Sequence, residues 1–150
     1  MRLTRRQMLT TGIFGSAAWV LALLGVRHAR AGDDALDFVE RMTGRKASAS
    51  NRLHLVMPSE FSTGYTVPMD IQVDSAMTET DHVKSIRVFA PENPFIEVAQ
   101  FHFSPRRCLA RVSTRIRLAG PQYVVALAEM SDGRLLMAKS WISVATNGCR

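Results

Sequence analysis

The sequence predicts an all-β fold: an antiparallel β-sandwich preceded by one short helix and followed by a flexible C-terminal arm. Three observations lead to this prediction. Seven stretches rich in β-branched and other apolar residues follow one another, and short breaks containing Pro, Gly, Ser or Asp separate them. Residues 113–118 alternate polar and apolar side chains, as a half-buried strand does. About 119 residues follow the N-terminal segment described next, which is enough for one hydrophobic core.

Residues 1–31 are predicted to be an export signal of the twin-arginine type. Arg5 and Arg6 precede an apolar pair, residues 11–26 carry no charge, and Ala29-Arg30-Ala31 has the small-x-small pattern of a cleavage site. The alternative, a membrane span, fails on length, because a span needs about 20 strongly apolar residues. An Arg-Arg pair also occurs in ordinary signals, so the general export route stays open.

Removal of this signal changes the charge balance. The whole chain has 19 Lys and Arg against 13 Asp and Glu, a net charge of +6. Five of the arginines precede Gly32 and no acidic residue does, so the mature form would have 14 basic and 13 acidic residues, or +1. The basic character therefore belongs mostly to the signal, and we expect no nucleic-acid binding.

Residues 33–43 are predicted to form the helix. Acidic residues crowd its first turn, where they suit the positive end of the helix dipole, and Gly44 is a plausible stop. Apolar residues recur at helical spacing at Leu36, Val39 and Met42. The stretch 45–51 is small and polar, which predicts a linker.

The sandwich is expected to span residues 53–145, with the arm at 146–150. Its breaks hold the residues that turns require, among them Pro58, Gly120-Pro121 and Ser131-Asp132-Gly133. The predicted strands are 53–57, 67–74, 82–90, 96–103, 108–118, 122–130 and 134–145.

The two cysteines, Cys108 and Cys149, carry the chemistry of the chain. Cys149 is the second-to-last residue, and chain ends are poorly ordered unless something ties them down. Its thiol could carry a substituent on a mobile arm, pair in a disulfide, or be incidental. Export leads to an oxidising compartment, so a Cys108–Cys149 disulfide is one open reading.

The sequence shows no pattern typical of a metal site or a catalytic site. A blue-copper loop needs ligands after its cysteine, and only Arg150 follows Cys149. The histidines of the mature part, His54, His82 and His102, fall in three separate strands without zinc spacing. There is no GxSxG elbow, and the C-terminus is too short for a prenylation box. We expect no metal and no cofactor.

A basic stripe is predicted on the fifth strand. Arg111, Arg115 and Arg117 share one parity and so would lie on one face. The stripe is either the solvated face of the strand or a docking patch for acidic partners.

Several segments together resemble the SoxY family, the sulfur carriers of thiosulfate oxidation. The similar segments are Val83–Ile86, Asn93-Pro94, Val98–Phe103, Val112–Leu118 and Val125–Gly133. The resemblance implies an immunoglobulin-like sandwich in the periplasm, paired with a SoxZ-like subunit. It also implies a carrier that is not itself an enzyme. The resemblance further implies three partner enzymes: a haem enzyme that couples thiosulfate to the carrier's thiol, a hydrolase that releases sulfate, and a sulfur dehydrogenase that acts on the remaining sulfur.

By position, the resemblance assigns covalent attachment of the sulfur compound to Cys149, on an arm with Asn147, Gly148 and Arg150. The family's arm usually reads Gly-Gly-Cys-Gly-Gly, whereas here one glycine precedes the cysteine and none follows it. The bulk of Arg150 therefore bears on which enzymes the arm can enter. Two alternatives stay open: an exported interaction module with a structural Cys108–Cys149 disulfide, and a diverged carrier for another sulfur species.

Overall fold

The structure is a computed structural model that describes residues 30–106 and 108–149. Nearly all of the predicted export signal, including Arg5 and Arg6, lies outside these residues, and so does Arg150. Within the described part of the chain, no helix is both long enough and apolar enough to cross a membrane.

Helix α1 (Arg30–Thr43) begins three residues before the expected start and ends as predicted. Gly44 follows it with a φ of 67°, and its N–H donates to the carbonyl of Glu40 at 2.8 Å. Glycine adopts this left-handed conformation without a steric cost, so it ends the helix. From Ala35 onward the helix lies against a sheet, where Val39 is fully buried and the Phe38 ring meets Phe89 edge-on at 5.9 Å.

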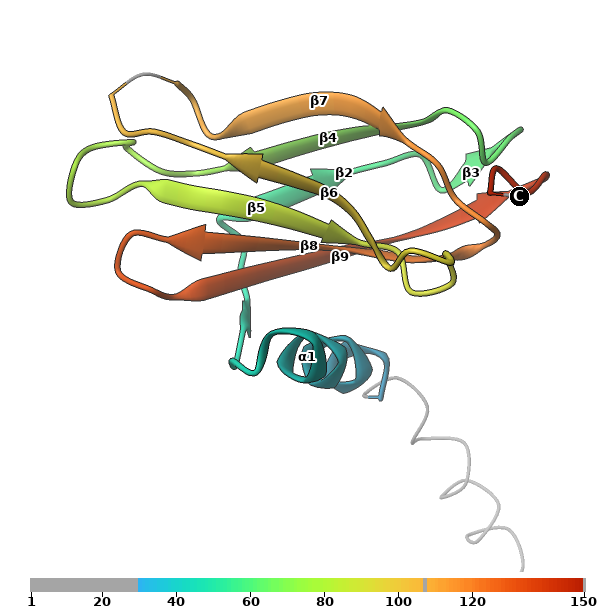
Figure 1. Cartoon of the computed structure of the whole chain (residues 1–150), viewed down its shortest axis with the longest axis horizontal. Coiled ribbons are helices and arrows are strands. Elements are labelled where there is room, and N and C mark those ends of the chain that lie inside the picture. The colour runs from blue at the N-terminus through green and yellow to red at the C-terminus, as the bar shows by residue number, and fades with distance from the viewer. Residues whose placement is uncertain (1–29, 107, 150) are drawn as a thin grey trace, which may run out of the picture. The chain divides into compact units, whose positions relative to one another are not determined.

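Two β-sheets face each other and form the predicted immunoglobulin-like sandwich (Figure 1). The larger sheet has the strand order β1 (Ser48–Ala49), β9 (Leu135–Val144), β8 (Gln122–Met130), β5 (Val83–Phe89) and β6 (Glu97–His102), with β3 (Glu60–Phe61) also on β9. The smaller sheet has the order β2 (Leu53–Val56), β4 (Val67–Val73) and β7 (Arg111–Ile116). All seven predicted strands are present, and their bounds differ from the prediction by three residues at most.

Two short strands lie where the sequence predicted none. The stretch 45–51, predicted to be a linker, contains β1, and a predicted break contains β3. Both pair in parallel with β9, through Ser48–Leu136 and Glu60–Ser143, so the sandwich is not wholly antiparallel. Each has two residues, too few to show a period of two. Phe61 of β3 also packs against the main hydrophobic core.

The hydrophobic core lies between the two sheets. Alternate residues of β4, Val67, Met69 and Ile71, are fully buried there and meet buried residues of β5, β8 and β9. A second cluster lies on the other face of the large sheet, where Val125 and Leu127 of β8 pack with α1. Strand β8 is thus buried on both faces, which accounts for its almost continuous apolar sequence.

Strands β6 and β7 are the edges of their sheets and lie on the same side of the sandwich without pairing. The side chains of β6 are only half-buried or exposed along its whole length. The C-terminal end of the chain lies at one end of the sandwich, near β3 and the segment that follows β7 (Figure 1). These two edges and the chain end form the candidate site.

Candidate functional site

The residues after β9 are bonded to two other segments of the backbone. The N–H of Gly64 donates to the carbonyl of Thr146 at 2.8 Å, and the N–H of Gly148 donates to the carbonyl of Leu118 at 2.8 Å. Leu118 in turn donates to the carbonyl of Gly64 at 2.8 Å. The tail is therefore docked as far as Gly148 in this structure. The predicted mobility of the arm stays a prediction, and it requires these bonds to open.

Glycine is required at both contact points. A Cβ on Gly148 would overlap the carbonyl of Gly64 and stand 2.6 Å from the backbone nitrogen of Tyr65. A Cβ on Gly64 would overlap the carbonyl of Leu118 and stand 2.7 Å from both the nitrogen of Gly148 and the oxygen of Thr146. All these atoms belong to the backbone, so a side-chain rotation cannot relieve the overlap. The predicted arm residue Gly148 thus allows close packing of the docked tail.

Asn93 holds the segment to which the tail docks. Its side-chain N–H donates to the carbonyl of Arg117 at 2.8 Å, and its side-chain oxygen accepts from the backbone of Ala119 at 2.8 Å. The same oxygen accepts from the side chain of Gln122 at 3.1 Å, and both side chains are buried. Asn93 therefore fixes the peptide groups on either side of Leu118.

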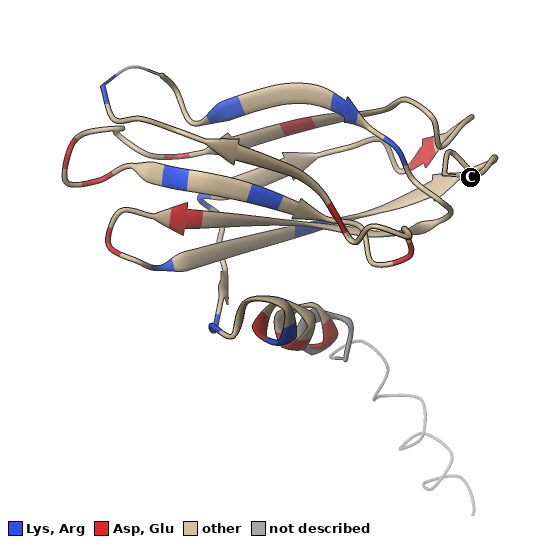
Figure 2. Ribbon diagram, viewed as in Figure 1, with Lys and Arg blue, Asp and Glu red and all other residues tan. Residues whose placement is uncertain are grey.

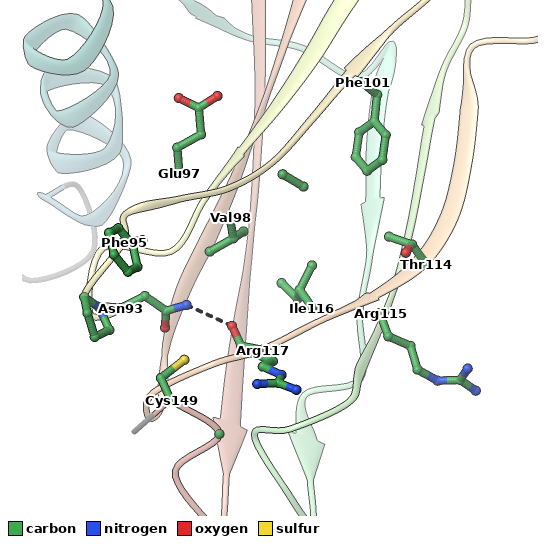
Figure 3. Close-up of a pocket in the computed structure, with 13 residues that line it drawn as sticks. Asn93, Phe95, Glu97, Val98, Phe101, Thr114, Arg115, Ile116, Arg117 and Cys149 are labelled. Atoms are coloured by element: carbon green, nitrogen blue, oxygen red, sulfur yellow. Dashed lines mark hydrogen bonds between the residues drawn. The ribbon is translucent and has the colours of Figure 1, made fainter.

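Cys149 lies half-buried at one end of a groove of 590 Å³ between β6 and β7 (Figure 3). The side chain of Asn147 orients it by accepting a 2.7 Å hydrogen bond from the Cys149 N–H. The groove exists because the two edge strands do not pair, and side chains from both line it. Its apolar lining comes from Pro94, Phe95, Val98, Ala99, Phe101 and Ile116.

The charged lining of the groove is positive. Arg115 and Arg117 line it, and neither forms an ion pair with another described residue. Figure 2 shows basic residues toward both ends of β7 and no acidic residue along it. The acidic residue in the lining, Glu97, is held by Arg87 through hydrogen bonds of 2.6 and 3.1 Å. Those bonds lower the pKa of Glu97 below its ordinary value and raise that of Arg87.

Three of the predicted site residues, Asn147, Gly148 and Cys149, thus lie together. The predicted basic stripe divides, because Arg111 lines separate hollows with His54, Asp70 and Gln72 rather than the groove. Sequence reasoning missed two positioning residues, Gly64 and Asn93. Asn93-Pro94 was noted only as one of the segments that resemble the SoxY family. The only sequence signal for Gly64 was its position as an isolated glycine in a polar loop.

The alternative of a Cys108–Cys149 disulfide is wrong, because both cysteines are free. Cys108 lies before the start of β7, where its Sγ contacts the carbonyl of Ser104 at 3.4 Å. Cys149 lies beside the residues that follow β7. A six-residue strand spans about 20 Å at ~3.3 Å per residue, far beyond the ~7 Å between Cα atoms that a disulfide allows.

No group of three or more His, Cys, Asp or Glu side chains among the described residues could hold a metal ion. His54 pairs with the carboxylate of Asp74 at 2.9 Å, and this hydrogen bond lowers the pKa of Asp74. Both side chains are about half exposed, so the pair is a surface feature.

Solved structures share the fold at low sequence identity. The sulfur carrier protein SoxY from Chlorobium limicola superposes with a TM-score of 0.58 at 23% identity, covering 76% of this chain and 98% of that one. A superoxide reductase from Ignicoccus hospitalis gives 0.57 at 15% identity, covering 64% and 82%. A putative superoxide reductase from Thermotoga maritima gives 0.55 at 17%, covering 65% and 93%. At these identities the likeness concerns the fold alone.

No curated protein matches the chain in sequence. One family model does match: that of the sulfur oxidation protein SoxY, over residues 39–149. The match begins within α1, includes the whole sandwich and ends at Cys149. This chain belongs to the SoxY family of sulfur oxidation proteins.

Proposed function

We propose that this protein is a periplasmic carrier that holds thiosulfate-derived sulfur covalently on Cys149 during thiosulfate oxidation. One observation carries the proposal: the SoxY match extends to Cys149, a free cysteine at one end of the groove between β6 and β7. The protein itself catalyses no step. It presents its cargo to partner enzymes.

Cysteine suits this role because a thiolate forms and exchanges sulfur–sulfur bonds. In the loading step, the Cys149 thiolate and thiosulfate form a new S–S bond, giving the S-thiosulfonate Cys–S–S–SO3⁻ and releasing two electrons. A haem-containing partner accepts those electrons. Water then cleaves the bond to the terminal sulfonate, which leaves a persulfide Cys–S–S⁻ on the carrier and yields sulfate and two protons. A sulfur dehydrogenase oxidises the remaining persulfide.

The arm delivers the thiol by leaving its docked position. The five residues from Ala145 to Cys149 reach at most about 17 Å when extended, at ~3.3–3.6 Å per residue. Release of all five residues requires the backbone hydrogen bonds at Ala145, Thr146 and Gly148 to open, and no side chain has to leave the core for this. Arg150, with its bulky side chain, limits which enzyme clefts the tip can enter.

Export and assembly complete the proposal. The Arg5-Arg6 segment directs the chain out of the cytoplasm, and residues 32–150 form the carrier domain. The partner subunit is a SoxZ-like protein. Because the twin-arginine route takes folded proteins, a partner without its own signal would cross as part of the folded pair.

Intact-protein mass spectrometry tests this function. The purified protein is incubated with thiosulfate and the haem coupling enzyme, without reductant. We expect the mass of one thiosulfonate group on the wild type and on Cys108→Ser, and none on Cys149→Ser. An adduct that persists on Cys149→Ser contradicts the proposal, as does an unmodified wild type. A different added mass on Cys149 would identify a carrier for another sulfur species.

A further inference from the structure

We propose that Phe95 is the anchor by which this protein binds the enzymes that act on Cys149, with Tyr65 as a second aromatic contact. The partner is an enzyme whose cleft admits the arm and whose surface beside the cleft has an apolar pocket for the Phe95 ring. This inference rests on the proposed carrier function and adds a protein-binding surface to it.

The short arm decides where such an enzyme must lie. Val144 is buried in the core, so the arm is fixed at that residue. Cys149 is the fifth residue beyond it, and five extended residues reach at most about 17 Å. An enzyme that takes the thiol into a cleft must therefore lie against the end of the sandwich where the tail leaves. It then covers the side chains that are exposed at that end.

Two exposed aromatic residues lie beside the docked tail. Phe95 is 85% exposed, more than any other large hydrophobic side chain among the described residues. Figure 3 shows it at the same end of the groove as Cys149. Tyr65 is 43% exposed and follows Gly64, whose backbone bonds to the tail. One exposed aromatic residue is ordinary on a protein surface, but here two of them border the segment that a partner enzyme must approach.

The backbone on either side of Phe95 is held in place. The N–H of Ala90 donates to the carbonyl of Ile96 at 2.8 Å across the turn between β5 and β6. Within that turn the N–H of Asn93 donates to the carbonyl of Ala90 at 3.0 Å, and the Asn93 side chain is buried. Pro94 fixes its own φ angle. The Phe95 ring is thus presented on an ordered turn, and an ordered aromatic side chain loses little entropy on binding.

Phe95 has nearly all of its surface to offer to a partner. A Phe side chain buries roughly 150–250 Å² when it is fully covered, and aromatic side chains in apolar pockets supply much of the binding energy of protein interfaces. The same exposure means that the ring contributes little to the fold. Removal of the ring therefore tests binding without disturbing the sandwich.

Charged residues border this surface on the side of β7. Arg115 and Arg117 are exposed, and neither forms an ion pair with another described residue. Glu92, in the same turn as Phe95, is exposed and acidic. The partner surface should therefore have carboxylates opposite the end of β7. Exposed charges of this kind mainly raise the association rate, whereas an apolar anchor mainly lowers the dissociation rate.

The test compares Phe95→Ala with Leu109→Ala in binding to the haem coupling enzyme and in loading by it. Leu109 is the matched control, because it is 79% exposed but precedes β7, at the opposite end of the sandwich from Cys149. Both variants should unfold at the wild-type urea concentration. The reaction of Cys149 with a small disulfide reagent, measured in a Cys108→Ser background, should have the same rate in all forms.

We expect Phe95→Ala to raise the Kd of the complex and the KM for the carrier at least about tenfold, through faster dissociation, with kcat unchanged. Tyr65→Ala should raise both in the same direction. Leu109→Ala should bind and load as the wild type does.

Wild-type Kd and KM in Phe95→Ala would overturn the proposal and leave the carrier function standing if loading occurs. An equal loss in Leu109→Ala, or slower reaction of Phe95→Ala with the small reagent, would also overturn it. Binding that depends on Phe95, combined with no transfer of thiosulfate to Cys149, would leave the binding surface standing and remove the thiosulfate function.

Discussion

Gly64→Ala is the sharpest perturbation of the docked tail, because it acts on the arm without changing the arm's sequence. The new Cβ would overlap the carbonyl of Leu118 and stand 2.7 Å from the backbone atoms of Gly148 and Thr146. Asn93 holds the peptide groups around Leu118 in place. The overlap with the backbone atoms of Gly148 and Thr146 is relieved when the tail leaves its docked position.

The magnitude follows from the bonds that open. Two backbone hydrogen bonds join the tail to the sandwich at this point, Gly64 to Thr146 and Gly148 to Leu118. At a net value of about 0.5–1.5 kcal/mol each, their loss shifts the docking equilibrium by about 1–3 kcal/mol. That corresponds to a fall of roughly 5- to 150-fold in the exchange protection of both amides.

Amide hydrogen exchange followed by NMR measures this protection residue by residue. Gly120→Ala is the matched control, because a Cβ there meets nothing within 4 Å. Core amides of β8 should exchange at the wild-type rate in both variants. If Gly148 in Gly64→Ala stays as protected as in the wild type, the tail is not held by these contacts and the reasoning fails.

Three further predictions concern the surroundings of the site. Asn93→Ala leaves the Ala119 N–H without its acceptor and removes the nearer of two acceptors of the buried Gln122 amide, so it should lower the free energy of unfolding by about 1–3 kcal/mol in urea titrations and weaken docking of Gly148. Glu97→Gln should cost about 1 kcal/mol at neutral pH. Arg87 lowers the pKa of Glu97 from its ordinary 4.5, so the ion pair stabilises the folded state above that pH. The difference in unfolding free energy between Glu97→Gln and the wild type should therefore vanish as the pH falls through the lowered pKa. A difference that does not depend on pH would contradict this. Cys108→Ser, at an exposed position, should change stability by less than about 0.5 kcal/mol and leave loading of Cys149 intact.

The main strands could be predicted because their sequences carry the signals of a sandwich. Strand β8 was predicted at 122–130 and lies at Gln122–Met130, where the flanking Pro121 and Ser131-Asp132-Gly133 mark both ends. Strand β7 was expected from residue 108 but begins at Arg111, because the backbone turns at Arg106, which has a φ of 62°. The pattern of apolar residues does not indicate a turn at this position, so the start of β7 could not be predicted from it.

The site could be predicted only in part. Cys149 was identified from its position and from the family resemblance, since a thiol next to a chain end is visible in the sequence. The groove was not, because it arises where two sheet edges and the chain end meet, and Gly64 and Gly148 are far apart in the sequence. The parity of the arginines was read correctly, but parity alone does not tell which of them the sandwich places beside Cys149.

The central claim is that Cys149 carries sulfur in the cell, and peptide mapping of the native protein tests it most directly. The protein is isolated without reductant from cells grown on thiosulfate and cleaved with trypsin, which places Cys149 in peptide 140–150 and Cys108 in peptide 108–111. We predict persulfide and thiosulfonate adducts on peptide 140–150 and none on peptide 108–111. Unmodified 140–150 peptide in cells that are converting thiosulfate to sulfate would contradict the claim.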